Sequence, residues 1–404
     1  MAATEMELCT SAISEVDLVE RGVQQQASPL AASLIDAGPR RKRKKLERRD
    51  DCEYSQPLRL SIQLLFVALN VWIGVQFYLW VRWAESGAQT SEVARPAGVE
   101  GWLPIEGLMQ LKYFAITHQL PRVHPAGFFS FVAFLAISII FRKSFCSWLC
   151  PVGTASEYLW KLGRFTFSRN LQLPRWADIA LRSLKYLLLG FFVYAVASMS
   201  AIPIAEFLGS PYALVVDVRM LNFFRFLGAT AGIVLLLLIV ASIVIQNFWC
   251  RYLCPYGAFL GLASLASPSR ITRNVSTCID CGKCSKACPA LLPVDQLVQI
   301  RSAECTGCLE CVAVCPAKDT LSLSVPAVPG TRRPLPAWSV AVGIASLLRV
   351  GGLRETDQPL EYAVAERRVP PACTASERAT APDAATVARK PSCAAEEQVI
   401  GAPV

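Results

Sequence analysis

Long apolar segments without charge constrain this chain of 404 residues more than any other feature. Three uncharged segments, Leu60–Trp80, Tyr186–Ile204 and Phe226–Trp249, are each long enough to cross an apolar layer about 30 Å thick. A fourth, Pro125–Phe141, is at the short end of that range and is followed directly by two basic residues. We therefore expect an α-helical membrane bundle of about four transmembrane helices. The low share of charged residues, 18%, also argues against an ordinary soluble enzyme.

The basic residues predict the orientation of this bundle. Eight Lys and Arg residues lie between positions 40 and 49, before the first segment, and eight more lie in the connection 142–185. The connection 82–123, of similar length, has four. Because basic residues accumulate on the cytoplasmic side of a membrane, we expect the N-terminus, the 142–185 connection and everything after Trp249 to be cytoplasmic. Much of the net charge of +9 is then a topology signal, and we expect no nucleic-acid partner.

Two runs of four cysteines between residues 278 and 316 give the strongest chemical signal. Both have the spacing C-x2-C-x2-C-x3-C-P, and they end at Pro289 and Pro316. In this spacing three close thiolates bind three corners of one [4Fe–4S] cube, and the fourth cysteine turns toward the other cube. The expected ligands are Cys278, Cys281, Cys284 and Cys315 for cluster 1, and Cys305, Cys308, Cys311 and Cys288 for cluster 2.

Zinc is the competing interpretation of these cysteines, because C-x2-C pairs also bind Zn²⁺ in tetrahedral sites. Such sites use ligands in two pairs, whereas each run here is a quartet that ends in Pro, so the spacing favours iron–sulfur clusters. Gly282 and Gly307 allow the backbone to bend close to sulfur. A segment of this size buries little core unaided. Over residues 269–325 we expect a small α+β domain of the bacterial 2[4Fe–4S] ferredoxin type, which its clusters help to hold together.

A second pair of cysteine motifs follows two of the apolar segments. Cys146-Ser-Trp-Leu-Cys150-Pro151 and Cys250-Arg-Tyr-Leu-Cys254-Pro255 share the spacing C-x3-C-P, and a Gly follows each Pro by two residues. A Pro disfavours helix at the residue before it but suits the first turn of a helix. We therefore expect Cys150 and Cys254 to lie at helix breaks, with short new helices beginning at Pro151 and Pro255.

These four cysteines form a candidate site near the inner membrane surface if the two motifs face each other. Residues i and i+4 of a helix share one face, so each pair can aim both sulfurs at one point. Such a site would suit a metal, a third cluster or two redox-active dithiols. Four inert buried cysteines are the remaining interpretation, and the spacing does not decide among these.

The combined pattern of four motifs resembles the membrane polyferredoxins of bacterial respiratory systems over roughly residues 58–325. Members of this family include the ferredoxin-type membrane subunit of periplasmic nitrate reductase systems, the polyferredoxin half of the nitrous-oxide reductase regulator and the cytochrome oxidase accessory iron–sulfur protein. The residues before the first span do not read as the flavin-binding domain of the regulator. Those after residue 325 do not read as the β-sandwich of the oxidase accessory protein. The nitrate reductase subunit and its short relatives are therefore the best fit.

The resemblance implies a multi-pass protein of the bacterial inner membrane. It implies that the eight cysteines of the two longer runs bind clusters and that the four C-x3-C-P cysteines are functional thiols. The implied function is electron transfer between the quinone/quinol pool, or another respiratory redox protein, and a respiratory reductase. The alternatives are a copper reductase or assembly factor for a respiratory oxidase, and a redox-sensing regulator. Without a nucleophile–base pair, phosphate loop or dinucleotide fingerprint, we expect an electron-transfer component rather than a stand-alone enzyme.

His124 is the candidate residue for a quinol site. It lies at the start of the second expected span, where a quinol head group could give up a proton. Glu106 and Lys112 are close to it in the chain. An interfacial histidine without such a role is the alternative.

The expected organisation has four parts. Residues 1–57 form a disordered basic arm, 58–268 a transmembrane domain with both C-x3-C-P motifs, 269–325 the ferredoxin domain, and 326–404 a mostly disordered tail. In the tail, the apolar stretch Trp338–Leu348 stops well short of the roughly 18 residues that span a membrane. Cys9, Cys52, Cys373 and Cys393 lack motif context and are expected to be incidental thiols.

Overall fold

The computed structural model describes residues 47–49, 54–86, 93–120, 124–168, 170–171, 173–326 and 332–355. These residues divide into two compact units. The first unit contains the chain up to Asn70, Ser130–Met199 and Gly228–Gly351, and the second contains Val71–Phe129 and Ser200–Leu227. Most of the expected N-terminal arm, the tail after residue 355 and the four cysteines without motif context lie outside the described residues.

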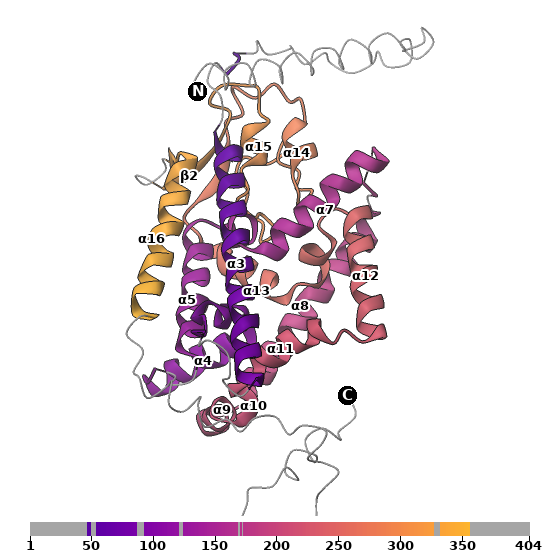
Figure 1. The fold of residues 1–404 in the computed structure, drawn as a ribbon. Coiled ribbons are helices and arrows are strands. Elements are labelled where there is room, and N and C mark those ends of the chain that lie inside the picture. The colour runs from indigo at the N-terminus through magenta and orange to yellow at the C-terminus, as the bar shows by residue number, and fades with distance from the viewer. Residues whose placement is uncertain are drawn as a thin grey trace, which may run out of the picture. The chain divides into compact units, whose positions relative to one another are not determined.

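The described chain is mostly helical, with one small sheet (Figure 1). Helices α3 (Ser55–Glu85) and α5 (Pro125–Ile140) contribute to both units. The rest of the first unit consists of α6 (Ser144–Trp148), α7 (Pro151–Phe167), α8 (Arg175–Ser198), α12 (Ala229–Val244), the π-helical turn η2 (Trp249–Leu253), α13 (Pro255–Ala263), the 3₁₀ turn η3 (Ser264–Ala266), β1 (Arg270–Arg273), α14 (Lys283–Ala287), α15 (Glu310–Ala313), β2 (Leu321–Pro326), β3 (Arg332–Pro334) and α16 (Ala337–Glu355). The second unit adds the 3₁₀ turn η1 (Ala97–Trp102), α4 (Pro104–Thr117), α9 (Ala201–Leu208), α10 (Pro211–Leu214) and α11 (Val216–Arg225).

Two helices in the described part of the chain are long and apolar enough to cross a membrane. They are α3 and the segment Trp176–Ser198 of α8. Helices α11 and α12 make a third candidate if they count as one broken span. Helix α5, with 16 residues, is a shorter apolar helix. By length and composition, the structure therefore supports two or three of the four expected spans.

Helix α12 is shorter than the apolar segment Phe226–Trp249 from which we predicted it. It begins after Gly228 and ends at Val244, because Ile245 adopts extended backbone. Asn247 then has a φ of 53°, a left-handed conformation that Asn tolerates better than most residues. Polar turn residues therefore end the helix inside a segment whose composition alone favours a full span.

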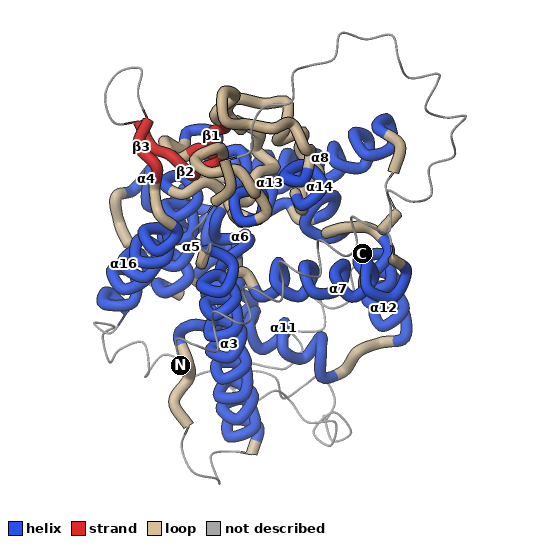
Figure 2. The backbone as a smooth tube through the Cα atoms, turned by 90° about the horizontal axis from the view of Figure 1, so that it is seen from above, coloured by secondary structure: helices blue, strands red, loops and turns tan. Residues whose placement is uncertain are grey.

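The three strands form one antiparallel sheet in the order β1-β2-β3 (Figure 2). Ile271 of β1 pairs with Leu323 of β2, and both side chains are buried. Val325 of β2 pairs with Arg333 of β3. Strand β3 thus lies beyond residue 325, where we expected the ferredoxin domain to end. Its apolar content is too low to predict a strand, but the backbone hydrogen bonds of the β2 edge hold it in place.

One apolar core joins the cysteine-bearing loops to the helices around them. It includes Phe134 of α5, Trp148 of α6 and Leu323 of the sheet together with Cys284, Cys288, Cys305 and Cys311. Val340 and Ile344 of α16 are buried in the same core, so the apolar stretch Trp338–Leu348 lies on a helix that packs against this unit. The iron–sulfur region therefore belongs to the same compact unit as the helix ends beside it.

The close packing of α7 on α12 predicts that alanine substitutions at two glycines will change the stability of the protein by different amounts. A Cβ on Gly163 would touch the carbonyl oxygen of Ile243 and lie 2.8 Å from its carbonyl carbon, whereas a Cβ on Gly190 of α8 meets nothing within 4 Å. We expect Gly163→Ala to lower the free energy of unfolding by about 1–3 kcal/mol. Gly190→Ala should leave it unchanged or raise it by up to about 1 kcal/mol. Thermal unfolding in detergent measures both, and equal melting temperatures would contradict this packing.

Candidate iron–sulfur and thiol sites

The eight ferredoxin cysteines surround two separate cavities. The first cavity has a volume of about 350 Å³ and is lined by Cys278, Cys281, Cys284 and Cys315. The second has a volume of about 320 Å³ and is lined by Cys288, Cys305, Cys308 and Cys311. Three cysteines of one run and the last cysteine of the other meet at each cavity, which is the grouping that the spacing predicts. We call these spaces cavity 1 and cavity 2.

The two cysteine runs also repeat one backbone shape. The residue before the second cysteine and the residue after it both have positive φ in each run. These residues are Asp280 (56°) and Gly282 (69°) in the first run, and Gly307 (62°) and Leu309 (61°) in the second. A left-handed residue is costly unless it is Gly, so the surrounding structure must hold Asp280 and Leu309 in place. The bends expected at Gly282 and Gly307 are present. In each run a second residue, Asp280 or Leu309, is also left-handed, and the sequence did not indicate it.

Four cysteines line each cavity, and four thiolates are the donor set that a [4Fe–4S] cube requires. Within the described ranges, no group of three or more His, Cys, Asp or Glu side chains has the arrangement to hold a single metal ion.

Cavity 1 and cavity 2 differ in their contact with solvent. Cys281 of cavity 1 is exposed, whereas all four cysteines of cavity 2 are buried. At cavity 1, the Arg273 guanidinium donates to the Cys278 sulfur over 3.4 Å. Cavity 2 is lined by apolar residues such as Ile271, Leu292 and Ile300. Cavity 1 is therefore the one whose cysteines reach the surface of this unit.

The C-x3-C-P motifs have the local structure that the sequence predicts. Helix α6 ends at Trp148, Cys150 is extended, and α7 begins at Pro151. In the same way η2 ends at Leu253, Cys254 is extended, and α13 begins at Pro255. Each of these two cysteines therefore caps the N-terminus of a helix, where free backbone N–H groups favour a negatively charged sulfur.

The structure brings Cys146, Cys150, Cys250 and Cys254 together, and we call this group the four-cysteine site. Cys250 is close enough to the other three sulfurs for their charges to interact. The Gly257 backbone N–H donates to the Cys254 sulfur over 3.2 Å, so the glycine that follows Pro255 by two residues contacts the sulfur of the capping cysteine.

Burial keeps the thiols of Cys146, Cys150 and Cys250 protonated at neutral pH. It raises the pKa of Cys146 to about 12, against the opposing effect of the Lys143 ammonium, and raises the pKa of Cys150 to about 11. Burial also raises the pKa of Cys250 well above its ordinary value. A thiolate forms here at neutral pH when a bound metal takes the place of the thiol proton.

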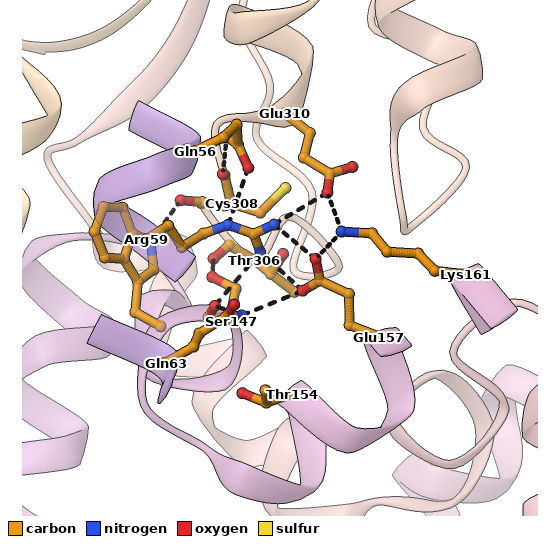
Figure 3. A network of polar contacts seen from close by, with 12 residues as sticks. Gln56, Arg59, Gln63, Ser147, Thr154, Glu157, Lys161, Thr306, Cys308 and Glu310 are labelled. Carbon is orange, nitrogen blue, oxygen red and sulfur yellow. Dashed lines mark hydrogen bonds and ion pairs between the residues drawn. The ribbon is translucent and has the colours of Figure 1, made fainter. Parts of the chain in front are cut away.

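A buried network connects the N-terminal end of α3 to the loop of cavity 2 (Figure 3). Arg59, only 3% exposed, binds both oxygens of Glu157 at 2.9 and 2.7 Å and reaches Glu310 at 3.0 Å. Lys161, which lies on α7 one turn after Glu157, binds that carboxylate over 2.6 Å. The Arg59 charge also interacts with Cys308. Three segments far apart in the sequence thus meet at one guanidinium.

Backbone carbonyls of the cavity 2 loop complete this junction. Gln56 of α3 donates to the Cys308 carbonyl over 3.0 Å. From α6, the Ser147 hydroxyl donates to Thr306 over 2.7 Å, and the Trp148 indole donates to Gly307 over 3.1 Å. These contacts fix the loop that carries Cys305, Cys308 and Cys311 against α3 and α6.

The second unit contains a buried acidic and basic cluster around His124. His124 is 1% exposed, and its Nδ1 lies 2.7 Å from Glu106. Burial lowers the pKa of His124, but the Glu106 carboxylate outweighs this effect and the pKa is raised. Arg95 lies 3.3 Å from Glu100 and 2.7 Å from Asp217. Glu106, which is close to His124 in the chain, is buried on α4 beside the histidine, while His118 is exposed at the end of α4.

Sequence reasoning did not identify Arg59, Lys143, Glu157, Glu304 or Glu310 as site residues. Each is a charged residue that no motif identifies as functional, and Arg59, Glu157, Glu304 and Glu310 all have an ion-pair partner far away in the chain. Arg59 offers the one available signal, because a charged residue that close to an apolar segment needs a partner or an exit to solvent.

Removing Arg59 should destabilise the first unit. Arg59→Met leaves Glu157 and Glu310 buried without their main cation, which costs about 3–5 kcal/mol. Arg59→Met combined with Glu157→Met should recover part of this loss, because only one carboxylate then stays behind. Arg164→Met, which removes an exposed arginine stacked on Trp160, is the matched control and should cost less than 1 kcal/mol. Chemical unfolding in detergent measures all three, and a loss in Arg59→Met no larger than in the control would contradict the network.

Glu100 should make the stability of the protein depend on pH. Burial raises its pKa from 4.5 to about 7, against the charges of His124 and Arg95. Folded Glu100 thus holds its proton more tightly, so its contribution is complete below pH 4.5 and is lost as the pH rises through 7. The loss is about 3 kcal/mol. The free energy of unfolding, measured from pH 4.5 to 8, should fall more in the native protein than in Glu100→Gln. The same pH dependence in both proteins would contradict this prediction.

Comparisons with known proteins agree with the cysteine geometry. The family described as "4Fe-4S binding domain" matches residues 123–170 and 227–273, which contain both C-x3-C-P motifs. The family described as "4Fe-4S dicluster domain" matches residues 270–316, which contain both longer runs. No solved structure matches the chain.

Similar proteins cover between about a third and two thirds of this chain. "Putative electron transport protein YccM" of Escherichia coli is 53% identical over 267 residues, 66% of this chain and 75% of the relative. "Ferredoxin-type protein NapH" of E. coli is 26% identical over 219 residues, 52% of this chain and 70% of the relative. "Methylamine utilization ferredoxin-type protein MauN" of Paracoccus denitrificans is 30% identical over 151 residues, 36% of this chain and 48% of the relative. The chain belongs to the family of ferredoxin-type membrane polyferredoxins that includes YccM and NapH.

Proposed function

We propose that this protein is a membrane-bound iron–sulfur electron-transfer protein with one [4Fe–4S] cluster in each cavity. Cys278, Cys281, Cys284 and Cys315 bind the first, and Cys288, Cys305, Cys308 and Cys311 bind the second. The grouping of the eight cysteines around two cavities is the observation that carries this proposal. A cluster of this type, when bound, takes up and releases single electrons.

The surroundings of the two cavities support different roles for their residues. Cys281 reaches the surface, so a redox partner can approach cavity 1 closely. The apolar residues and buried cysteines of cavity 2 exclude water, and the contacts of Gln56, Ser147 and Trp148 hold its loop beside α6. Because α6 carries Cys146, cavity 2 is the neighbour of the four-cysteine site. We assign to that site a third metal or cluster, which completes a row of three redox groups.

The membrane part fits a role beside the quinone/quinol pool. In this proposal the protein crosses the bacterial inner membrane four times, with the N-terminus and the ferredoxin domain in the cytoplasm. Helix α5 provides the additional span together with the broken pair α11 and α12. His124, held by Glu106, accepts a proton from quinol, and the electrons go on to a respiratory redox partner and its reductase. Burial raises the pKa of Glu100, in the same cluster, to about 7, which suits a group that exchanges protons near neutral pH.

Metal analysis after anaerobic purification tests the cluster assignment. We expect about eight iron atoms and eight acid-labile sulfides per chain from two cubes, and about twelve if the four-cysteine site holds a third cube. Cys281→Ser and Cys308→Ser should each remove one EPR-detectable cluster and leave the other. Near-zero iron with stoichiometric zinc would overturn the proposal.

Reduction by quinol tests the direction of the proposed path. In anaerobic membranes, a quinol analogue such as duroquinol should reduce the clusters of the native protein. His124→Gln should slow this reduction at least tenfold, while dithionite still reduces the same clusters completely. His118→Gln, at the exposed histidine of the same connection, is the matched control. Quinol reduction at the native rate in His124→Gln would contradict the role of His124.

A further inference from the structure

A buried lysine lies inside the four-cysteine site. Lys143 is the N-cap residue of α6 and is 4% exposed. Its Nζ and the Cys254 sulfur each lie 3.5 Å from the position that a Cβ would take on Gly257, and Nζ lies 3.6 Å from the same position on Gly261. The two glycines are one turn apart on α13. The Lys143 ammonium thus lies over a glycine face of α13, close to the sulfur of Cys254.

The cation is costly at this position without negative charge near it. The N-termini of α7 and α13 both carry partial positive charge and both point at this site. Glu304 is a nearby carboxylate, but Lys185 binds it over 2.6 Å and the Tyr186 hydroxyl binds it over 2.8 Å. Glu304 therefore neutralises one of these two lysines, and a second negative charge is needed for the other.

The internal repeat indicates that the motif does not need a lysine in order to fold. Lys143 stands three residues before Cys146, and the equivalent position before Cys250 is Asn247. Both motifs still end in an extended cysteine followed by a helix that begins at Pro. The lysine is thus an addition to one half of the site and not a requirement of C-x3-C-P geometry.

The charge of the sulfurs distinguishes the possible states of the site. Four thiols or two disulfides are neutral and leave the excess cation uncompensated. Thiolates that bind a metal group carry net negative charge, which Lys143 and the two helix N-termini offset. Cations also act on cysteines of the other two cavities, because Arg273 donates to Cys278 and the charge of Arg59 acts on Cys308. Each of the three sulfur sites thus has at least one cationic side chain near it.

We propose that Lys143 is the counter-cation of the four-cysteine site, and that this site holds an iron–sulfur cluster bound through four thiolates. The inference rests on the proposed electron-transfer function. Lys143 is a positioning residue, which acts on the bound group through its charge. Since one added electron makes the group more negative, Lys143 favours the reduced state and raises the reduction potential of this site relative to a site without it.

An EPR-monitored redox titration of the full-length protein, purified anaerobically in detergent, tests this role. The signal of the four-cysteine site is first identified as the one lost in Cys146→Ser and Cys250→Ser. In Lys143→Met its reduced-to-oxidised ratio at a fixed potential should fall at least tenfold, which corresponds to about 59 mV for one electron. Lys143→Arg keeps the charge and should restore most of the shift. Arg333→Gln removes an exposed arginine of β3 and should change nothing.

Three results would overturn the inference. The first is an unchanged potential in Lys143→Met, or, where that variant does not accumulate, in Lys143→Gln. The second is an equal shift in Lys143→Arg, which would indicate a packing effect instead of a charge effect. The third is an iron content in Cys146→Ser and Cys250→Ser that equals the iron content of the native protein. In that case about eight irons and both ferredoxin signals should persist, and the proposed function would stand without a third cluster.

Discussion

Compensation of buried charge is the constraint on which the first unit depends. Carboxylates are buried where α3, α7 and α8 meet the loops of the iron–sulfur region, and each needs a cation at close range. Arg59 supplies it for Glu157 and Glu310, and Lys185 supplies it for Glu304. Both carboxylates from the loops, Glu304 and Glu310, are next to a cysteine in sequence. The same ion pairs that join the iron–sulfur region to the helices therefore also fix the positions of its cysteines.

This constraint explains why the iron–sulfur region and the helix ends share one unit. An isolated segment of about 55 residues has a small core, and its clusters would have to supply most of its stability. Here Cys305 and Cys311 pack in the same apolar core as Trp148 and Phe134. Movement of the cavity 2 loop away from α6 would expose that core and would break the bonds of Ser147 and Trp148 to Thr306 and Gly307. Electron transfer falls steeply with distance, so a fixed loop keeps neighbouring redox groups close.

The sequence predicted the features that depend on local chemistry. Cysteine spacing predicted the grouping around both cavities, and the rule for residues before Pro predicted the breaks at Cys150 and Cys254. The ion pairs could not be predicted, because Arg59 is about a hundred residues from Glu157 and further still from Glu310, and a lone charge has no pattern. Helix lengths were also difficult to predict. Hydropathy does not register that Asn247 accepts a left-handed turn, so α12 is shorter than its apolar segment.

The two C-x3-C-P motifs have similar backbones but differ in charge. Their backbones are alike through the extended cysteine and the helix that follows, so they supply four sulfurs in two similar pairs. They differ at the position three residues before the first cysteine, where one has Lys143 and the other Asn247. Lys143 shares the neighbourhood of Glu304, the residue directly before Cys305 of cavity 2. The added positive charge thus belongs to the motif on α6, whose Ser147 and Trp148 also bind the cavity 2 loop. One charge therefore makes the two halves of the four-cysteine site unequal, and it belongs to the motif that contacts the cavity 2 loop.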